Sequence, residues 1–340
     1  MSDLEDGATR VRFYQTGTFT VGNRLIDPAL RTVQAAPDRP NALTSGHRAC
    51  QGCGQALGAR YVLDAAMRAT KGRLVTVNAT GCLEVFTTAS PESAWQVPWM
   101  HSVFGNAAPV AAGVAAALAV KGKQDIRVLA QGGDGGTADI GFGPLSGMFE
   151  RNDDVLYVCY DNQGYMNTGV QRSSATPPTA RTATTPALGP EPGNAFDQGK
   201  NLPALAMAHG IPYVATASVT DLHDLEAKIS RAILMRGARY VHVDVPCPLG
   251  WGHAGDETIQ VARLAVESGL FPLFEWQAGA ITGRSQIRRR VPVDACLRLQ
   301  RRFANLFDGS EASRARLARL QGIADANIER FGLAGKETRS

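Results

Sequence analysis

The chain has 340 residues, of which 44% are hydrophobic and 19% are charged, enough to bury one large globular core with extensions. Its formal net charge of +4 is small for this length, so nucleic acid is not expected as a partner. The longest apolar run, residues 107–120, is too short to cross a bilayer and is expected to form a buried helix. Association with a membrane is therefore not expected either.

The N-terminal segment is expected to be an extended arm. Residues 1–6 are acidic and lack the basic and then apolar order of a signal peptide, which predicts a cytoplasmic protein. In that compartment the six cysteines are expected to be ligands, nucleophiles or buried thiols rather than disulfides. Residues 1–44 lack a steady hydrophobic period and contain three prolines, so an arm is predicted, with disorder as the alternative.

Four cysteines lie at or near the ends of expected elements. Cys50 and Cys53 form a C-x2-C pair just before an expected helix, whereas Cys82 and Cys247 each follow an expected strand. Loops at the same edge of a sheet can converge, and thiolates that meet there bind a soft metal. The spacing leaves a four-thiolate zinc site and an iron–sulfur cluster equally open.

A glycine-rich segment, GGDGGTADIG at residues 132–141, lies between an expected strand at 126–130 and an expected helix at 140–150. Glycines let the backbone approach a ligand closely, and the N-terminus of a helix offers free N–H groups to a diphosphate. Asp134 can supply a hard oxygen to the magnesium ion that neutralises the phosphates. The segment therefore predicts half of a diphosphate site.

A second segment, DNQGYMNTG at residues 161–169, follows the next expected strand, at 155–160. It can offer the side-chain oxygen of Asn162 and the carbonyl oxygen of Gly164 to the same ion. Ordinary turns are the alternative, because Gly and Asn are common in any left-handed turn. The pairing of the two segments predicts a diphosphate-and-metal site.

Strands and helices alternate through the main domain, expected at residues 45–282. The expected strands are residues 74–78, 126–130, 155–160, 212–216 and 240–245, and the expected helices include a helix that ends near residue 69, 140–150, 202–209 and 219–236. This order predicts an α/β fold with a doubly wound, mostly parallel sheet, helices on both faces and ligands at the C-terminal ends of the strands.

Two segments outside this alternation have their own character. The Thr-, Pro- and Gly-rich stretch up to residue 199 is expected to be a long ordered loop. Residues 283–340 are expected to form a basic, helical C-terminal extension. Its expected apolar contacts are Leu297, Phe303, Leu306, Leu317 and Leu320.

The chain closely resembles the β subunits of pyruvate:ferredoxin oxidoreductase, also called pyruvate synthase, in the 2-oxoacid:ferredoxin oxidoreductase family. The resemblance runs from about residue 46 to about residue 275 and rests on GHRACQGCG, NATGC, GGDGGTADIG, CYDNQGYMNTGVQRSSATP, IPYVATAS and PCPLGW. It implies a fold that binds thiamine diphosphate (ThDP), and it favours an iron–sulfur cluster over zinc.

The resemblance also implies roles for individual residues. Cys50, Cys53, Cys82 and Cys247 would hold a 4Fe-4S cluster, and Asp134, Asn162 and the Gly164 carbonyl would hold Mg²⁺. The residues expected to contact ThDP are Gln55, Cys82, Gly133, Asp134, Gly135, Gly136, Asn162, Gln163, Gly164, Tyr165, Met166 and Asn167. Asn167 is expected to be catalytic, reaching the reactive end of the cofactor and the substrate. Gln55 stands where the family often has glutamate, so a neutral hydrogen bond is expected there.

The activity implied is the ThDP-dependent oxidative decarboxylation of pyruvate with coenzyme A to acetyl-CoA and CO2, reversible, with electrons passed to the 4Fe-4S cluster. An α subunit would supply the glutamate that activates ThDP and most substrate contacts. Further γ, δ or ferredoxin-like subunits are expected, with ferredoxin or flavodoxin as the final acceptor.

Three alternatives to this activity remain. The first is the same chemistry on a branched-chain, aryl or other 2-oxoacid. The second is a non-redox ThDP decarboxylase or carboligase with structural zinc. The third is a non-catalytic assembly subunit that retains the fold.

Overall fold

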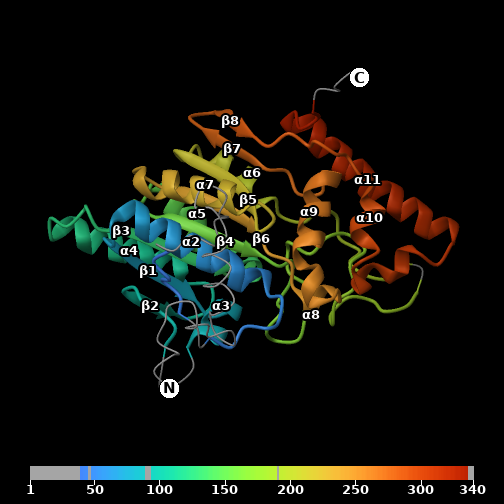
Figure 1. The fold of residues 1–340 in the computed structure, drawn as a ribbon, viewed down its shortest axis with the longest axis horizontal. Coiled ribbons are helices and arrows are strands. Elements are labelled where there is room, and N and C mark those ends of the chain that lie inside the picture. The colour runs from blue at the N-terminus through green and yellow to red at the C-terminus, as the bar shows by residue number, and fades with distance from the viewer. Residues whose placement is uncertain (1–38, 45–46, 89–92, 190, 336–340) are drawn as a thin grey trace, which may run out of the picture.

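The computed structural model describes residues 39–44, 47–88, 93–189 and 191–335, and these contain one eight-stranded sheet in the order β2-β1-β3-β4-β6-β5-β7-β8 (Figure 1). The strands are β1 Leu74–Ala79, β2 Trp99–Ser102, β3 Arg127–Gly133, β4 Leu156–Asp161, β5 Tyr213–Ser218, β6 Arg239–Asp244, β7 Phe274–Gln277 and β8 Ala280–Arg284. Strands β1 to β6 run parallel to one another, whereas β7 pairs antiparallel with β5 and β8 pairs antiparallel with β7.

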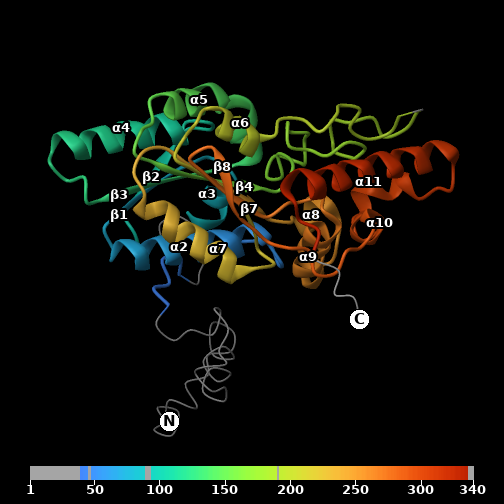
Figure 2. The same cartoon turned by 90° about the horizontal axis from the view of Figure 1, so that it is seen from above.

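Helices cover both faces of the sheet (Figure 2), which confirms the predicted doubly wound α/β fold. The helices are α2 Gly54–Thr70, α3 Cys82–Thr87, α4 Ala107–Val120, α5 Phe142–Glu150, α6 Leu202–Ala208, α7 Leu222–Leu234, α8 Pro248–Trp251, α9 Thr258–Ser268, α10 Val293–Leu297 and α11 Glu311–Phe331. On one face α2 and α7 pack against the sheet, and on the other α4, α5 and α6 do so. None of the helices in the described ranges combines the length and apolar composition needed to cross a membrane.

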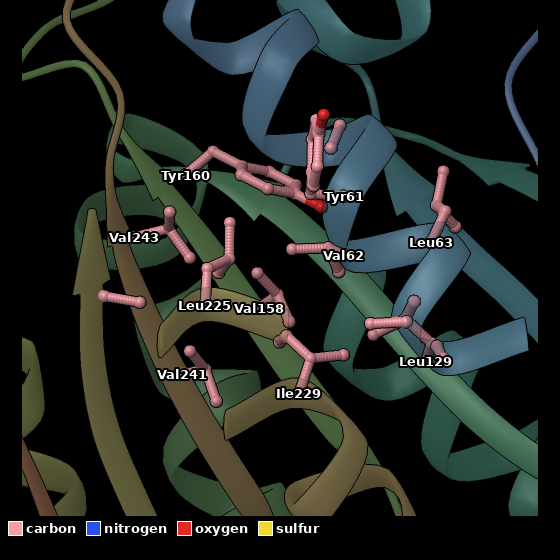
Figure 3. Packing of buried hydrophobic residues seen from close by; sticks show 14 of the residues in the cluster. Tyr61, Val62, Leu63, Leu129, Val158, Tyr160, Leu225, Ile229, Val241 and Val243 are labelled. Atoms are coloured by element: carbon pink, nitrogen blue, oxygen red, sulfur yellow. The ribbon is translucent and has the colours of Figure 1, made fainter. Parts of the chain in front are cut away.

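The core on the α2 and α7 face is formed by side chains that the central strands direct towards these helices (Figure 3). Val158 and Tyr160 of β4 and Val241 of β6 contact Val62 of α2 and Ile229 of α7 within this cluster. Strands β4, β5 and β6 are buried at every residue, as expected for parallel strands covered on both faces. Their mostly apolar sequences therefore follow from their central position.

The parallel strands end at one edge of the sheet, where ligands bind in such folds. Strand β1 leads to Cys82, β3 to Asp134, β4 to Asn162 and β6 to Cys247. A single-turn π-helix, Gly136–Ile140, joins β3 to α5, and such turns are frequent at functional sites. The topology thus brings the two predicted cofactor segments and the later cysteines to a common edge.

Three sequence expectations differ from the structure. The helix at residues 107–120 forms as predicted, but only Ala107, Ala108 and Ala111 are buried and Val120 is 90% exposed. Its C-terminal end projects beyond the sheet (Figures 1 and 2), and Val114, Ala115 and Leu118 are only partly buried where they pack against the core. Strand β2 and the hairpin β7–β8 were not predicted, and the domain boundary expected at 282/283 falls within β8.

The long loop after β4 is ordered, as predicted. Asn194 is buried and its side chain donates to the Thr176 carbonyl at 2.8 Å, while backbone bonds join it to Thr179 and Ala180. Lys200 donates to the Ala138 carbonyl at 2.6 Å and ties the end of the loop to the π-helical turn. The loop is therefore held against the cofactor edge of the sheet.

The C-terminal extension packs against the main domain rather than standing apart. Four of its five predicted apolar residues, Leu297, Phe303, Leu306 and Leu320, are buried in one cluster, and Leu317 packs against that cluster. Of the predicted N-terminal arm, residues 1–38 lie outside the described residues. Arg39 begins the described part and forms ion pairs with Asp64 and Glu226.

Three arginines near the N-terminal ends of β3 and β6 share one carboxylate, and replacing that carboxylate is expected to lower stability strongly. Asp154 accepts ion pairs from Arg127 at 3.0 Å, Arg236 at 2.8 Å and Arg239 at 2.5 Å. Because the Arg127 and Arg239 side chains are buried, Asp154→Asn would leave their charges uncompensated. We expect it to lower the free energy of unfolding by about 3 kcal/mol. Urea unfolding with an unchanged m-value would measure this.

The neighbouring Asp153, which pairs with the exposed Arg151, is the matched control. Asp153→Asn should change stability by less than about 1 kcal/mol. Burial raises the pKa of Asp154, but the charges and hydrogen bonds of the three arginines outweigh it and lower that pKa. Its stabilisation is thus present above the pKa of the unfolded carboxyl and is lost as the pH falls through the folded pKa. An equal loss of unfolding free energy in Asp154→Asn and Asp153→Asn would contradict this account.

Candidate active site

Three oxygen-bearing groups converge where β3 and β4 end. One terminal atom of the Asn162 amide lies 2.9 Å from the Gly164 carbonyl oxygen and 2.9 Å from Oδ1 of Asp134. The other terminal atom lies 3.4 Å from Oε1 of Gln55. With its nitrogen towards Gln55, the amide places three oxygens together, and with the amide reversed its nitrogen donates to the other two. The structure therefore brings the predicted metal ligands to one point.

The Asp134 carboxylate is buried and positioned by a residue that sequence reasoning missed. Oγ of Ser173 donates to its Oδ2 at 2.5 Å, and the Asn162 backbone N–H lies 3.3 Å from Oδ1. Burial and the nearby Asp161 carboxylate raise the pKa of Asp134, and the Ser173 hydrogen bond opposes the rise. A cation bound here would offset the cost of keeping this carboxylate ionised.

The Gly-rich segment combines crowded glycines, such as Gly135, with two open ones, Gly133 and Gly136. A Cβ on Gly135 would lie 2.5 Å from the Tyr165 ring, so this position requires glycine. Tyr165 in turn donates to Asp139 at 2.8 Å. At Gly133 and Gly136 the nearest neighbours of a Cβ would be 4.0 and 3.6 Å away. Their faces are therefore open to a ligand.

The remaining predicted residues of this segment differ in their surroundings. Gln163 is half-buried, whereas Asn167 is exposed. Met166 packs beside Cys247 and Trp251, and its sulfur would lie 2.0 Å from a Cβ on Gly250. Met166 thus joins the metal segment to the cysteine-bearing loop.

The four cysteines expected as ligands face one another. Burial raises the pKa of Cys82 to about 12, and the thiols of Cys247, Cys53 and Cys50 add to the rise. The pKa of Cys53 is raised to about 11, by burial and by two of the same neighbours. Within the described ranges, no three His, Cys, Asp or Glu side chains are grouped to hold a single metal ion. The thiols therefore converge more loosely than single-ion ligands would.

Three of these thiols lie at the N-termini of helices. Cys53 caps α2 and accepts from the Ala56 N–H at 3.4 Å, and Cys247 caps α8 and accepts from the Gly250 N–H at 3.3 Å. Cys82 is the first residue of α3. Because helix N-termini stabilise negative charge, they favour the thiolate forms that bind metal. Cys159 and Cys296 are buried elsewhere.

The Ser173 contact predicts an effect on metal affinity. Ser173→Ala would remove one hydrogen bond to an ionised carboxylate, so Asp134 would be less well oriented and less favoured as an anion. We expect the Mg²⁺ concentration for half-maximal ThDP binding to rise about tenfold. Fluorescence titration of the assembled protein at fixed ThDP would measure it. Ser174→Ala, which removes a donor to Asp139 only, should have a smaller effect.

Comparisons with known proteins identify the family of this chain. The family described as thiamine pyrophosphate enzyme, C-terminal TPP binding domain, matches residues 79–245. Pyruvate synthase subunit PorB of Methanosarcina barkeri is 48% identical over 292 residues, covering 86% of this chain and 97% of that subunit. Ketoisovalerate oxidoreductase subunit VorB of Pyrococcus abyssi is 42% identical over 266 residues, covering 76% and 84%.

A solved structure is also similar. It is 2-oxoglutarate:ferredoxin oxidoreductase from Magnetococcus marinus, with 2-oxoglutarate, coenzyme A and succinyl-CoA bound. The likeness has a TM-score of 0.53 at 26% identity and covers 64% of this chain and 72% of that one. The mostly parallel sheet with helices on both faces is thus that of a thiamine-diphosphate-binding domain. The chain belongs to the family of pyruvate synthase β subunits, within the 2-oxoacid:ferredoxin oxidoreductases, and is a subunit of an oxidoreductase.

Proposed function

We propose that this chain is the β subunit of a cytoplasmic pyruvate:ferredoxin oxidoreductase that carries ThDP, Mg²⁺ and one 4Fe-4S cluster. The reaction is the oxidative decarboxylation of pyruvate with coenzyme A to acetyl-CoA and CO2, or its reverse. The observation that carries the proposal is the three-oxygen group of Asp134, Asn162 and Gly164 beside four converging thiols. The Asp134 charge itself contributes to the raised pKa of Cys82, so the two groups are neighbours.

The oxygen group fits magnesium by its spacing. Neighbouring ligands of an octahedral Mg²⁺ ion, each about 2.1 Å from the metal, lie about 3.0 Å from one another. The Asn162 atom lies 2.9 Å from both of its neighbours, and a bound cation would favour the amide orientation in which this atom is the oxygen and the nitrogen lies 3.4 Å from Oε1 of Gln55. Without a cation between them, oxygens at this distance repel. Phosphate oxygens and water would complete the shell.

The diphosphate of ThDP fits the open side of the Gly-rich turn. Gly133 and Gly136 leave room for a ligand, whereas Tyr165 fills the space over Gly135. Backbone N–H groups at the start of the turn favour an anion. When bound, ThDP supplies the electron-accepting ring that makes loss of CO2 possible. The chain's own residues would bind the diphosphate, hold the metal and keep water away from the buried Asp134 carboxylate.

The thiols support a cluster better than zinc. Four sulfurs around one zinc ion, each about 2.3 Å from it, would lie about 3.8 Å apart. Among the described residues no three such side chains are grouped for a single ion, while the other three thiols still influence that of Cys82. A 4Fe-4S cluster holds its thiolates farther apart and accepts one electron at a time. Such an acceptor beside ThDP distinguishes an oxidoreductase from a non-redox decarboxylase.

An α subunit is needed to complete the site. Two carboxylates lie close in sequence to the cysteine segments: Glu84 accepts a hydrogen bond from Thr88 at the C-terminal end of α3, and Glu92 lies outside the described residues. Neither belongs to a recognisable activating motif, so the activating carboxylate is assigned to the partner. Large apolar side chains around the cofactor edge are exposed, which fits a surface covered by a partner. They are Val85, Met100, Val103, Ile140 and Leu249. Further ferredoxin-like subunits would carry electrons to ferredoxin or flavodoxin.

The test is anaerobic co-purification with the neighbouring subunits, followed by iron, sulfide, zinc and ThDP analysis. A panel of 2-oxoacids with coenzyme A and a one-electron dye would then be assayed. About four irons at this site, with ThDP and CoA-dependent reduction of the dye by pyruvate, is the expected result. Zinc without dye reduction would overturn the proposal. A branched-chain 2-oxoacid is the second candidate substrate, because the VorB relative is 42% identical.

A further inference from the structure

Arg302 is a buried arginine of the C-terminal extension that contacts the predicted metal segment. It belongs to a short 3-10 helix, Arg301–Leu306, and is 7% exposed. Nη2 donates to Oε1 of Gln163 at 2.5 Å, and Nε donates to Oε1 of Gln300 at 2.9 Å. Both contacts use the planar fork of the guanidinium, which fixes the direction of each bond.

Gln163 lies between two of the predicted metal ligands and has a strained backbone. Its φ of +63° is in the left-handed region, which is unfavourable for a residue other than glycine. Such a conformation persists only where surrounding contacts hold it. Its N–H donates to Asp161 at 2.9 Å, its carbonyl accepts from Thr176 at 2.8 Å, and Arg302 holds its side chain. Arg302 therefore helps to fix the turn that presents Asn162 and Gly164.

The same guanidinium also contacts the cysteine-bearing loop. Its central carbon lies 3.9 Å from the ring centroid of Trp251, a buried residue at the end of α8. The Trp251 indole donates to the Asn162 carbonyl at 2.6 Å, and its backbone N–H donates to the Cys247 carbonyl at 2.8 Å. Trp251 thus joins the metal segment to the helix that Cys247 caps, and Arg302 covers its ring (Figure 1 shows α8 beside the extension).

We propose that Arg302 is a positioning residue that holds the metal segment and the Cys247 helix in a fixed relation to each other. It acts through Gln163 on the metal ligands and through Trp251 on the cysteine loop. This inference rests on the proposed function and deepens it, because it assigns to the C-terminal extension a part in both cofactor sites. The charge of Arg302 faces the carboxylates of Asp161 and Asp244 as well as the Cys296 and Cys247 thiols.

Two variants separate the geometry of Arg302 from its charge. Arg302→Lys keeps the positive charge but loses the fork and most of the stacking, whereas Arg302→Met loses the charge as well. In the anaerobically assembled complex, both are expected to raise the dissociation constant for Mg²⁺-dependent ThDP binding about tenfold. Only Arg302→Met is expected to lower the midpoint potential of the cluster, because a nearby cation favours the reduced, more negative form.

Arg298→Met is the matched control. Arg298 belongs to the same extension and lies over Phe307 at 4.2 Å, but it is exposed and pairs with Asp294 instead of the metal segment. It should leave both ThDP affinity and the potential unchanged. If Arg302 had only a structural role, its replacement would lower the melting temperature but leave ThDP affinity and the midpoint potential of the cluster at the wild-type values. That result would overturn the proposal.

A double-mutant cycle with Gln163→Met keeps the inference testable if Arg302→Met fails to assemble. Gln163→Met keeps the length of the side chain but removes the acceptor for Arg302, so it should weaken ThDP binding to a similar degree. When Gln163→Met is combined with Arg302→Lys, ThDP affinity should fall little further, because both changes break the same contact between Arg302 and Gln163. Additive losses would contradict the coupling. A wild-type complex that lacks ThDP or iron would instead refute the proposed function, so the two failures are distinguishable.

Discussion

Replacing Asp134 by asparagine is expected to abolish Mg²⁺-dependent ThDP binding and to lower 2-oxoacid oxidation by the assembled complex by about a thousandfold or more. The amide has the shape of the carboxylate but not its charge. It would therefore leave the ion with neutral ligands from Asn162 and Gly164, which lie beside Asp134 in the oxygen group. Isothermal titration of ThDP with and without Mg²⁺ measures the loss of binding, and CoA-dependent dye reduction measures the loss of activity.

The same variant is expected to be more stable than the wild type when Mg²⁺ and ThDP are absent. Burial and the Asp161 charge raise the pKa of Asp134 in the folded chain. A carboxyl with a raised folded pKa costs no stability below its unfolded pKa, and the cost grows as the pH rises towards the folded value. The gain in melting temperature for Asp134→Asn should therefore be present at pH 7 and vanish near about pH 4.

Asp153→Asn serves as the control for this experiment too, because Asp153 pairs with Arg151 at the end of α5, away from the oxygen group. It should keep ThDP binding and show no gain in stability. Retained Mg²⁺-dependent binding by Asp134→Asn would show that the oxygen group is not the metal site. A destabilised variant without ligands would show that Asp134 has a structural role that outweighs the cost of its buried charge.

Sequence alone could predict the parts of this fold that depend on local pattern. The strand β4 could be predicted from its apolar run, which follows from burial of the strand at every residue. Asp134 and Asn162 could be predicted because each directly follows such a strand. The β7–β8 hairpin was missed because its turn, Ala278 and Gly279, has positive φ at both residues without the Asn-Gly or Asp-Gly signal.

Contacts that join distant parts of the chain could not be predicted. Ser173 reaches Asp134 across 39 positions, and Arg302 reaches Gln163 across 139. Nothing in their local sequence distinguishes them from the serines and arginines around them. The exposure of α4 was missed for a different reason. A helix that is apolar all round has no periodicity to indicate its buried face, so only packing shows that just its first residues are covered.

Replacing Cys247 by serine is expected to remove the cluster while ThDP binding remains. The hydroxyl would keep the cap of α8, where the sulfur now accepts from the Gly250 N–H at 3.3 Å, but would not serve as a soft thiolate ligand. We expect about four fewer irons at this site in the assembled complex. Dye reduction should fall more than about a hundredfold, beyond the effect usual for residues that only support a metal ligand. Iron analysis and electron paramagnetic resonance would measure the loss.

Cys296→Ser is the matched control, because Cys296 is buried in the apolar cluster against which Cys247 packs. Its sulfur contacts the amide of Gln300 at 3.3 Å and the Val261 carbonyl at 3.6 Å, so it has partners of its own. This variant should keep all of the iron. Cys82→Ser, at the start of α3, should lose iron as Cys247→Ser does. If Cys247→Ser and Cys82→Ser kept their iron, or if the wild type held zinc in its place, the four thiols would not be the cluster ligands and the electron path from ThDP would have to begin elsewhere.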